Sequence, residues 1–523
     1  MTHGEASNPQ PSRTQRDAHS DYSTDFAAGE RSRRATGGLL WSSLAVLSQA
    51  GGQLVVMAIL ARYLTPADFG VVSASLAIVA LGRMATKGVV GPALTQRPTL
   101  REEHVRTAFG LSLIIGITSA MLMWSLAPFF ADFFAMSRLV QIARGLSFVF
   151  AWQSLWIVPL ALLQRELQFK HIAMAETLSF GLGFAPLGVG LAMAGYGAWA
   201  LVAAYVGQAA VQAIYLMMRR PHPRALRMNT QAAKDLLYYG GGHTTARLLN
   251  YAALQGDYIV VGRWLSDAAL GIYGRAYQLG TTPAQLIGTA LDEVLFPTLS
   301  SFQEDRGRLG RAYLRAISLT STLMFPIAVV GVLLGPEIVD VVFGAGWERV
   351  KVPFQIIVAG LVWRTAYKLS DSLARAAGAV YARAWRQAIY AGLVIFGALV
   401  GLRWGLVGVS IAVLFAIIVN YVLMAELSVK ITGVGWGRLA FVHIRGALLG
   451  TLTGAIIMLV ATPVRLAVDR PLATVTASIL SVCVVLIVPS LFFPRVVLGD
   501  DALWFARRVA AIWRSRRERS DDD

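Results

Sequence analysis

Polar side chains recur at helical spacing inside three otherwise apolar segments of this sequence. Residues that are three or four positions apart lie on one face of a helix. The three series are Arg275, Gln278, Thr282, Gln285, Thr289 and Asp292; His243, Arg247, Asn250 and Asp257; and Arg364, Lys368, Asp371 and Arg375. A guanidinium presents a planar fork of donors that matches two phosphate oxygens. These faces therefore predict a cationic lining that binds a phosphate-bearing ligand.

Four cations near the middle of these segments are the candidate substrate-binding residues: Arg247, Arg275, Arg364 and Lys368. The candidate polar lining consists of Gln49, Gln53, His243, Asn250, Gln278 and Gln285. Three acids, Glu176, Asp257 and Asp371, either bind a coupling proton or Na⁺ or neutralise arginines, and the sequence leaves both roles open. We expect no catalytic residue, cofactor or metal, because the single Cys483 excludes a cysteine-based metal site and no Walker motif is present.

The composition indicates that membrane-spanning helices carry these faces. Of the 523 residues, 56% are hydrophobic and 15% are charged, whereas soluble domains have about 45–50% and about 25%. A helical span needs ~20 apolar residues, and we expect an all-α membrane protein with about 14 spans. Their approximate limits are 38–61, 68–90, 107–130, 141–163, 172–194, 198–218, 237–261, 268–291, 314–335, 352–375, 385–402, 405–427, 439–461 and 471–493.

Lysine and arginine are concentrated in alternate short loops, and the net charge is +17. The loops around residues 97–106, 219–234 and 306–315 are rich in these residues, and the loops between them hold few. Cytoplasmic loops are the ones enriched in Lys and Arg. We therefore predict a multi-pass protein with both termini in the cytoplasm. The positive charge is then explained by topology and by contact with membrane lipids, and no nucleic-acid partner is expected.

Three short sequence matches indicate an internal repeat. They are 61–71 with 262–272 at an offset of 201 residues, and 126–132 with 334–340 and 195–201 with 403–409 at an offset of 208. Six spans in each half relate the halves by an axis along the membrane normal, a symmetry of transporters whose substrate site lies between the halves. The matched residues Gly70 and Gly271 are expected in tight turns.

The spans and the repeat predict a domain organisation of six regions. They are a disordered cytoplasmic tail (1–36), an N-lobe of helices one to six (37–218), a cytoplasmic linker (219–236), a C-lobe of helices seven to twelve (237–428), two accessory helices (429–494) and a basic cytoplasmic tail (495–523). Gly446, Gly450 and Gly454 predict close packing of the first accessory helix against a neighbour.

The cost of burying charge decides what surrounds the four candidate cations. One cation at the bilayer centre costs ~2.5–3.5 kcal/mol, so four that face lipid would cost roughly 10–14 kcal/mol. This is comparable with the whole net stability of a protein, ~5–15 kcal/mol. The cations must therefore be hydrated or paired. Asp257 and Asp371 could neutralise two of them, and an anionic passenger in a cationic central cavity would supply the remaining charge.

Four motifs resemble the polysaccharide-transporter family. They are ARYLTPADFG at 61–70, ALLQRELQFK at 161–170, GDYIVVGRWLSDAALGIYGRAYQL at 256–279 and VLFPTLSSFQEDRGRLGRAYLRAI at 294–317. Members of this family are Wzx-type flippases of the MOP superfamily, to which the MATE exporters and the lipid II flippase also belong. The resemblance extends over roughly residues 37–460.

The resemblance implies alternating-access transport of an undecaprenyl-diphosphate-linked oligosaccharide from the cytoplasmic to the periplasmic leaflet of a bacterial inner membrane. Such transport serves exopolysaccharide or O-antigen biosynthesis, with polysaccharide polymerase and export proteins as partners. The lipid II branch has an Arg-Asp pair in its first helix. This chain has Gln49 and Gln53 there, which departs from that branch.

Other classes of protein fit the sequence less well. A MATE-like antiporter of cationic drugs favours acidic residues at mid-membrane, whereas cations prevail here, and a lipid II-type flippase is the other transporter alternative. A membrane enzyme is disfavoured because no outside loop exceeds ~20 residues and no nucleophile–base–metal set is visible. A channel or a structural protein would not need two similar halves with different charge. We therefore expect a transporter and not an enzyme.

Overall fold

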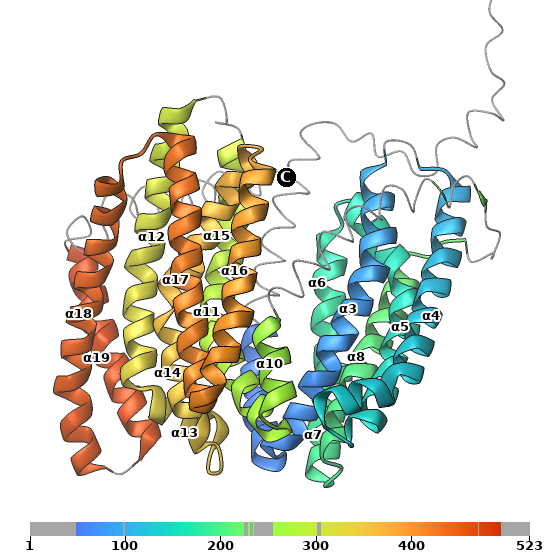
Figure 1. Cartoon of the computed structure of the whole chain (residues 1–523), viewed down its shortest axis with the longest axis horizontal. Helices are drawn as coiled ribbons and strands as arrows, with labels where there is room; N and C mark the ends of the chain where they lie inside the picture. Colours follow the sequence, from blue (N-terminus) through green and yellow to red (C-terminus); the bar gives the residue numbers. More distant parts are fainter. Residues whose placement is uncertain are drawn as a thin grey trace, which may run out of the picture. The chain divides into compact units, whose positions relative to one another are not determined.

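The computed structural model describes residues 49–97, 100–223, 229–230, 234, 255–300, 305–468 and 470–492 (Figure 1). These residues form helices and, within those ranges, no strand, which confirms the predicted fold class. Among the described residues, eight helical stretches are long and apolar enough to cross a membrane, and two of them, Phe169–Met193 and Val380–Thr432, contain more than one helix. The expected number of 14 spans stays a prediction.

Two compact units make up the chain. The N-terminal unit consists of Met1–Gln49, Ser75–Asp132 and Ser137–Tyr251, and the C-terminal unit consists of Ala50–Ala74, Phe133–Met136 and Ala252–Asp523. The first turns of helix α3 (Pro66–Gln96) therefore group with the C-terminal unit, and the rest of α3 with the N-terminal unit.

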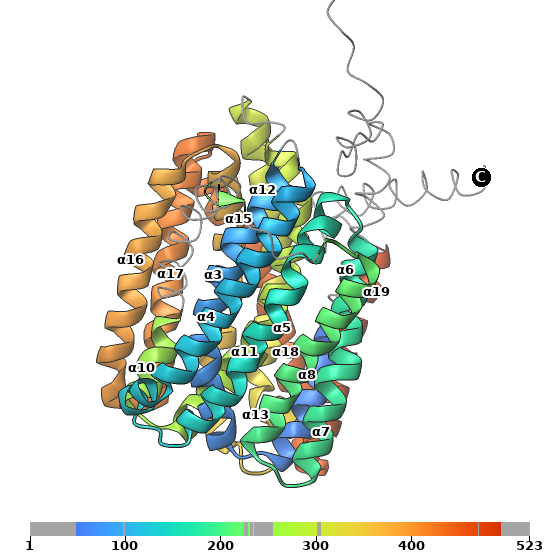
Figure 2. The same cartoon turned by 90° about the vertical axis from the view of Figure 1, so that its right-hand side faces the viewer.

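The N-terminal unit is built around a helix buried along most of its length. Its elements after α3 are α4 (Glu102–Phe134), α5 (Leu139–Arg165), α6 (Phe169–Leu178), the π-helix η1 (Ser179–Phe184), α7 (Ala185–Met193) and α8 (Ala198–Arg219). Helix α5 packs against α8 (Figure 2). Its side chains Trp156 and Leu162 lie in the core of the unit. The buried face of α5 is mainly apolar, and it also includes Ser154, whose carbonyl oxygen accepts a hydrogen bond of 2.8 Å from Ser112 of α4.

The C-terminal unit contains the predicted polar faces. Its elements are α10 (Gly256–Trp264), α11 (Asp267–Ser300), α12 (Arg306–Leu333), α13 (Gly335–Phe343), η2 (Glu348–Val350), α14 (Lys351–Ala359), α15 (Leu361–Ala376), α16 (Val380–Gly401), η3 (Leu402–Trp404), α17 (Gly405–Thr432), α18 (Trp436–Ala467) and α19 (Pro471–Phe492). Helices α11, α12, α15 and α17 enclose one core, in which Tyr313, Leu369 and Tyr421 are buried. Neither α11 nor α15 is among the stretches apolar enough to cross a membrane.

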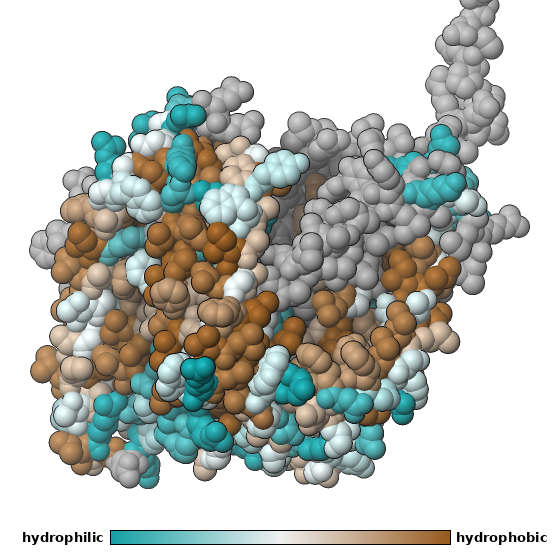
Figure 3. All heavy atoms as spheres, in the orientation of Figure 1, coloured by the Kyte–Doolittle hydropathy of each residue, from teal (hydrophilic) through white to brown (hydrophobic). Residues whose placement is uncertain are grey.

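The outer surface of the C-terminal unit is apolar over its middle. Figure 3 shows hydrophobic side chains there, with hydrophilic ones toward both ends. Large exposed side chains on α16, α17 and α18 include Phe396, Phe415 and Phe441. A soluble protein rarely exposes so much contiguous apolar surface, so this surface requires lipid as its solvent.

The first accessory helix, α18, packs closely on α12, as its glycines predict. A Cβ atom on Gly446 would lie 2.5 Å from the carbonyl oxygen of Ser321, and one on Gly450 would lie 3.2 Å from Cβ of Phe325. Any side chain at Gly446 would therefore push the two helices apart. The glycine seam joins the accessory helix to the C-terminal unit.

The matched glycines of the predicted repeat have similar surroundings in the two halves. Gly197 precedes α8 and Gly405 begins α17, with φ of 55° and 62°, a conformation that only glycine adopts readily. Gly70 and Gly271 lie inside α3 and α11, so the tight turns expected for them are wrong. A Cβ on Gly70 would lie 1.7 Å from the carbonyl oxygen of Asp267, and one on Gly271 would lie 1.8 Å from that of Pro66. The two glycines allow α3 and α11 to cross at backbone contact.

Candidate functional site

Asp257 lies buried in the first turn of α10, with 2% of its surface exposed. Its carboxylate accepts a hydrogen bond of 2.6 Å from the Tyr273 hydroxyl and one of 3.0 Å from the backbone N–H of Tyr258. A buried carboxylate is tolerated only when such donors satisfy it. Helix α11 therefore supplies the partner that holds this acid in place.

Arg364 is the most buried of the predicted substrate-binding cations that the structure describes, with 8% of its surface exposed. Its Nη1 donates a hydrogen bond of 2.7 Å to the Tyr277 hydroxyl, and its guanidinium carbon lies 5.0 Å from the centre of the Tyr277 ring. The ring face attracts a cation by about 0.5–2 kcal/mol. A single tyrosine thus provides Arg364 with both a hydrogen bond and a cation–π contact.

Tyrosine rings surround this pair of charges. The ring centres of Tyr258, Tyr273 and Tyr277 lie 5.4–6.0 Å apart. Asp257 and Arg364 are near enough for their charges to interact, although no ion pair joins them among the described residues. We call Asp257, Tyr258, Tyr273, Tyr277 and Arg364 the Arg364 cluster. It joins three helices, α10, α11 and α15, through polar contacts inside the C-terminal unit.

The Arg364 guanidinium keeps one unused donor. Its buried Nε has no hydrogen-bond partner within the part of the chain that the structure describes. An unsatisfied buried donor costs about 1–3 kcal/mol, and more when it is charged. Arg364 can therefore give a further hydrogen bond to an anion at little cost in existing contacts.

Arg275 and Lys368 are held differently from Arg364. The Arg275 guanidinium lies 4.6 Å above the ring of Phe69, in the first turn of α3. Lys368 is half-buried on α15, and its chain passes Gly288 of α11, where an added Cβ would lie 3.3 Å from Nζ. Because Gly288 has no side chain, the long Lys368 side chain fits against α11 at this position.

Asp371 is engaged by cations of the neighbouring turns. Its carboxylate forms an ion pair of 3.2 Å with Arg375 and another with Arg383. Arg375 lies at the end of α15, and Arg383 lies at the start of α16. The described contacts of the Asp371 carboxylate thus go to these arginines, one turn or more beyond Lys368.

The predicted polar lining is spread over several environments. Gln285 is exposed and donates a hydrogen bond of 3.2 Å to Thr281 on its own helix, while Gln278 is half-buried. Gln49 is half-buried and Gln53 is exposed. Glu176, on α6, is half-buried. His243, Arg247 and Asn250 lie outside the described residues.

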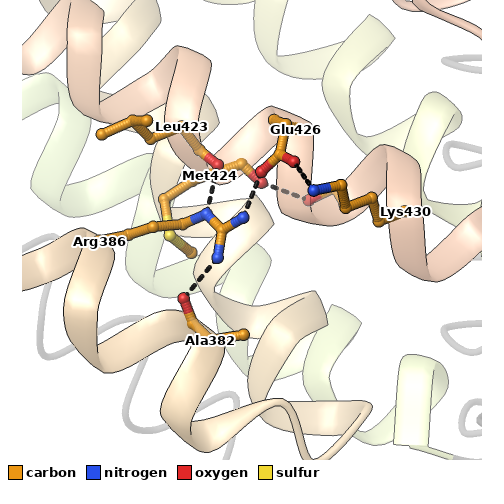
Figure 4. A network of polar contacts seen from close by, with 7 residues as sticks. Ala382, Arg386, Leu423, Met424, Glu426 and Lys430 are labelled. Atoms are coloured by element: carbon orange, nitrogen blue, oxygen red, sulfur yellow. Dashed lines mark hydrogen bonds and ion pairs between the residues drawn. The ribbon is translucent and has the colours of Figure 1, made fainter.

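A second buried arginine lies near the start of the predicted span 385–402 and was not among the candidate site residues. Arg386, 4% exposed, lies on α16 and binds three partners (Figure 4). It donates to the carbonyl oxygens of Leu423 (2.9 Å) and Ala382 (2.6 Å) and pairs with Glu426, which also binds Lys430. Each of its three nitrogens donates one hydrogen bond, so Arg386 fastens α16 to α17. The sequence feature that could have indicated this contact is Glu426, the acid in the next predicted span (405–427).

Another arginine missed by the sequence reasoning lies in the N-terminal unit. Arg83 of α3 is half-buried, and Tyr205 of α8 is near enough to act on its charge. Its signal was the weak hydrophobicity of the second predicted span. An arginine beside a tyrosine is therefore found in both units.

Comparisons with known proteins place the chain in a wider group. A family model described as polysaccharide biosynthesis protein matches residues 59–352. The lipopolysaccharide biosynthesis protein WzxC of Escherichia coli (strain K12) is 24% identical over 75% of this chain and 80% of its own. The succinoglycan biosynthesis transport protein ExoT of Rhizobium meliloti (strain 1021) is 28% identical over 59% of this chain and 62% of its own.

Solved structures share the fold at low identity. The lipid II flippase MurJ in an inward closed conformation aligns with a TM-score of 0.70 and 15% identity, over 88% of this chain and 99% of its own. An inward-facing multidrug resistance MATE transporter of the MOP superfamily aligns with a TM-score of 0.60 and 16% identity, over 75% of this chain and 98% of its own. These alignments show a MOP-type fold.

Proposed function

Because the chain belongs to the polysaccharide biosynthesis protein family, we propose that it is a flippase for an undecaprenyl-diphosphate-linked oligosaccharide. It moves this lipid from the cytoplasmic to the periplasmic leaflet of a bacterial inner membrane, with both termini in the cytoplasm. The names of its relatives WzxC and ExoT, a biosynthesis protein and a biosynthesis transport protein for polysaccharides, support this substrate class. None of these names describes an enzyme reaction.

The hard step of such transport is electrostatic. A diphosphate and its hydrated sugars must cross ~30 Å of hydrocarbon, and the protein must replace the water around the charge. An Arg–phosphate pair at 4 Å gains about 4 kcal/mol at an effective dielectric of 20, before desolvation. A buried arginine with a donor to spare supplies this interaction only while the passenger is present.

The observation that carries the proposal is the state of Arg364. Its guanidinium is buried against Tyr277 and has no ion pair with a carboxylate among the described residues. Arg386, also buried, donates a hydrogen bond from each of its three nitrogens and pairs with Glu426. Arg364 is therefore suited to bind a diphosphate, whereas Arg386 is suited to hold two helices together. Arg247, Arg275 and Lys368 complete the proposed cationic lining.

The choice between this passenger and the alternatives rests on charge. A carrier of cationic drugs would need an accessible acid, but Asp257 is covered by Tyr273 and Asp371 is held by two arginines. A lipid II-type flippase shares the phosphate chemistry, and the likeness to MurJ concerns the fold. Asp257, Glu176 and Asp371 stay candidates for a coupling proton or Na⁺, with Asp257 the strongest because neutral tyrosines rather than arginines bind it. Polymerase and export proteins are the proposed partners.

Complementation of a deletion strain tests the proposal. Deletion of the gene should stop polysaccharide export and make a lipid-linked oligosaccharide accumulate on the cytoplasmic face. The wild-type gene and Arg403→Ala, an exposed arginine of η3, should restore export, whereas Arg364→Ala should not. Immunoblots of membranes should show equal protein. Wild-type export from Arg364→Ala would contradict the role of Arg364, and normal export from the deletion strain would contradict the function.

A further inference from the structure

A basic pocket opens where α12 and α18 begin, away from the Arg364 cluster. It has a volume of about 410 Å³, and its charged lining consists of Arg311, Arg315 and Arg438. Its described lining residues include no acid and none that belongs to α10, α11 or α15. The two helices lie side by side in the C-terminal unit (Figure 1). Three cations thus converge on one hollow that the proposed transport path does not use.

The arginines of this pocket are exposed to the surroundings of the protein. Arg311, Arg315 and Arg438 are all exposed. The nearest acid on α12, Asp305, caps the helix by accepting from the backbone N–H of Arg308 at 2.9 Å and pairs with the Arg308 side chain. Several guanidinium forks around one hollow match the oxygens of a phosphate. The lining therefore selects a phosphate-bearing anion.

An apolar stripe continues from the pocket along α18. Phe441 lines the pocket, and Ile444, Leu448 and Leu452 follow at spacings of three or four residues, all exposed. From Phe441 to Leu452 the helix rises about 16 Å. This is about half of the ~30 Å hydrocarbon thickness, which is the depth that an acyl chain occupies in one leaflet. A head group in the pocket would have its chain on this stripe.

We propose that this pocket binds the phosphate of an anionic glycerophospholipid of the surrounding bilayer, with an acyl chain along α18. Basic pockets between membrane helices take such head groups. The phosphate would join arginines of α12 to Arg438 of α18, at the end of the seam where Gly446 contacts Ser321. The lipid would therefore hold the accessory helix on the C-terminal unit.

Lipid binding to the purified full-length protein tests this proposal. Native mass spectrometry would measure retention of phosphatidylglycerol and, as the uncharged reference, phosphatidylcholine. Each cation near a membrane surface contributes about fivefold to the binding of an anionic lipid, so Arg311→Gln with Arg438→Gln should weaken phosphatidylglycerol binding roughly thirtyfold. Arg311→Lys with Arg438→Lys should retain most of it.

A matched pair of arginines on the same helix end provides the control. Arg306 and Arg308 are exposed and do not line the pocket, so Arg306→Gln with Arg308→Gln removes the same charge and should leave binding within about threefold. Equal losses in both double variants, or equal retention of phosphatidylglycerol and phosphatidylcholine by the wild type, would overturn the proposal. It would also be overturned if the pocket variant lost undecaprenyl diphosphate but kept phosphatidylglycerol, since the pocket would then serve the transported lipid.

Discussion

Helix α5 of the N-terminal unit and helix α15 of the C-terminal unit occupy corresponding places in the repeat, yet they bury different chemistry. The offset of 208 residues pairs Trp156 with Arg364, and both are buried, at 2% and 8% exposure. The offset of 201 residues likewise pairs Val56 and Val72 with Asp257 and Tyr273, all four of them buried. At these three positions the first half of the sequence has apolar side chains, and the second half has polar or charged ones.

The difference teaches what each copy contributes. An apolar interior is stabilised by packing alone and tolerates no charge. The C-terminal copy satisfies its buried charges with tyrosine hydroxyls and ring faces. Because hydroxyls and rings leave the guanidinium charged, this copy holds a cation that a carboxylate partner would have cancelled. The two copies therefore differ in the chemistry of the side chains at paired positions.

Replacement of Trp156 by arginine, the residue type at the paired position 364, should destabilise the N-terminal unit strongly. Trp156→Arg removes a buried indole, a loss of about 3–5 kcal/mol by itself, and adds an unpaired buried charge, which costs more. We expect almost no monodisperse protein in size-exclusion chromatography of detergent extracts. The control, Tyr196→Arg, changes an exposed side chain of the same unit and should leave the yield unchanged. A thermal midpoint for Trp156→Arg equal to that of the wild type would contradict the comparison.

A double variant tests whether Tyr273 serves to satisfy the buried Asp257 carboxylate. Tyr273→Phe leaves the buried Asp257 carboxylate without its 2.6 Å donor, which should cost about 1–3 kcal/mol of stability. Asp257→Val added to Tyr273→Phe restores an apolar pair like Val56 and Val72, so the thermal midpoint should recover while export stays lost. If the double variant is no more stable than Tyr273→Phe alone, the hydroxyl does not serve the carboxylate.

The smallest expected effect concerns an ion pair found in one copy. Lys351 binds Asp340 at 2.8 Å, whereas the offset of 208 residues pairs these residues with Ala143 and Asp132. Burial disfavours the charged amine, but its hydrogen bonds to Asp340 and Glu348 prevail and raise the pKa of Lys351. A raised pKa stabilises the folded protein fully below the unfolded value of about 10.4, and this stabilisation is lost as pH rises through the folded value.

Lys351→Met should therefore lower stability by about 1 kcal/mol or less at pH 8, because the pair is half-buried at the protein surface, where ion pairs contribute little. The difference from the wild type should shrink above pH 11, and Asp340→Asn should behave alike. Thermal midpoints measured across this pH range check the prediction. A difference that stays constant to pH 12 would show that lysine packing, and not its charge, is responsible.

Spacing predicted much of the polar architecture but not its partners. The series Arg364, Lys368 and Asp371 showed which face of α15 is polar, and the weak hydrophobicity of α11 marked it as a helix that avoids lipid. The tyrosines escaped notice because an aromatic residue on a helix face is equally suited to an apolar core. Side-chain direction was also hidden, since Asp371 reaches Arg375 and Arg383, and only the packed helices determine that choice. Arg386 was not recognised either, because its partner Glu426 lies on α17.

The crossing of α3 and α11 has the geometry of a self-complementary contact. Gly70 contacts the carbonyl of Asp267, and Gly271 contacts the carbonyl of Pro66. Each of the two helices therefore contributes one glycine and one carbonyl to the contact. Contacts of this reciprocal kind are the hallmark of twofold homodimers. A half-length ancestor that associated with its own copy would have needed one such glycine, and gene duplication would have turned it into two. Replacement of either glycine by alanine alone would place a methyl group against a backbone carbonyl of the other helix. Both positions therefore require glycine.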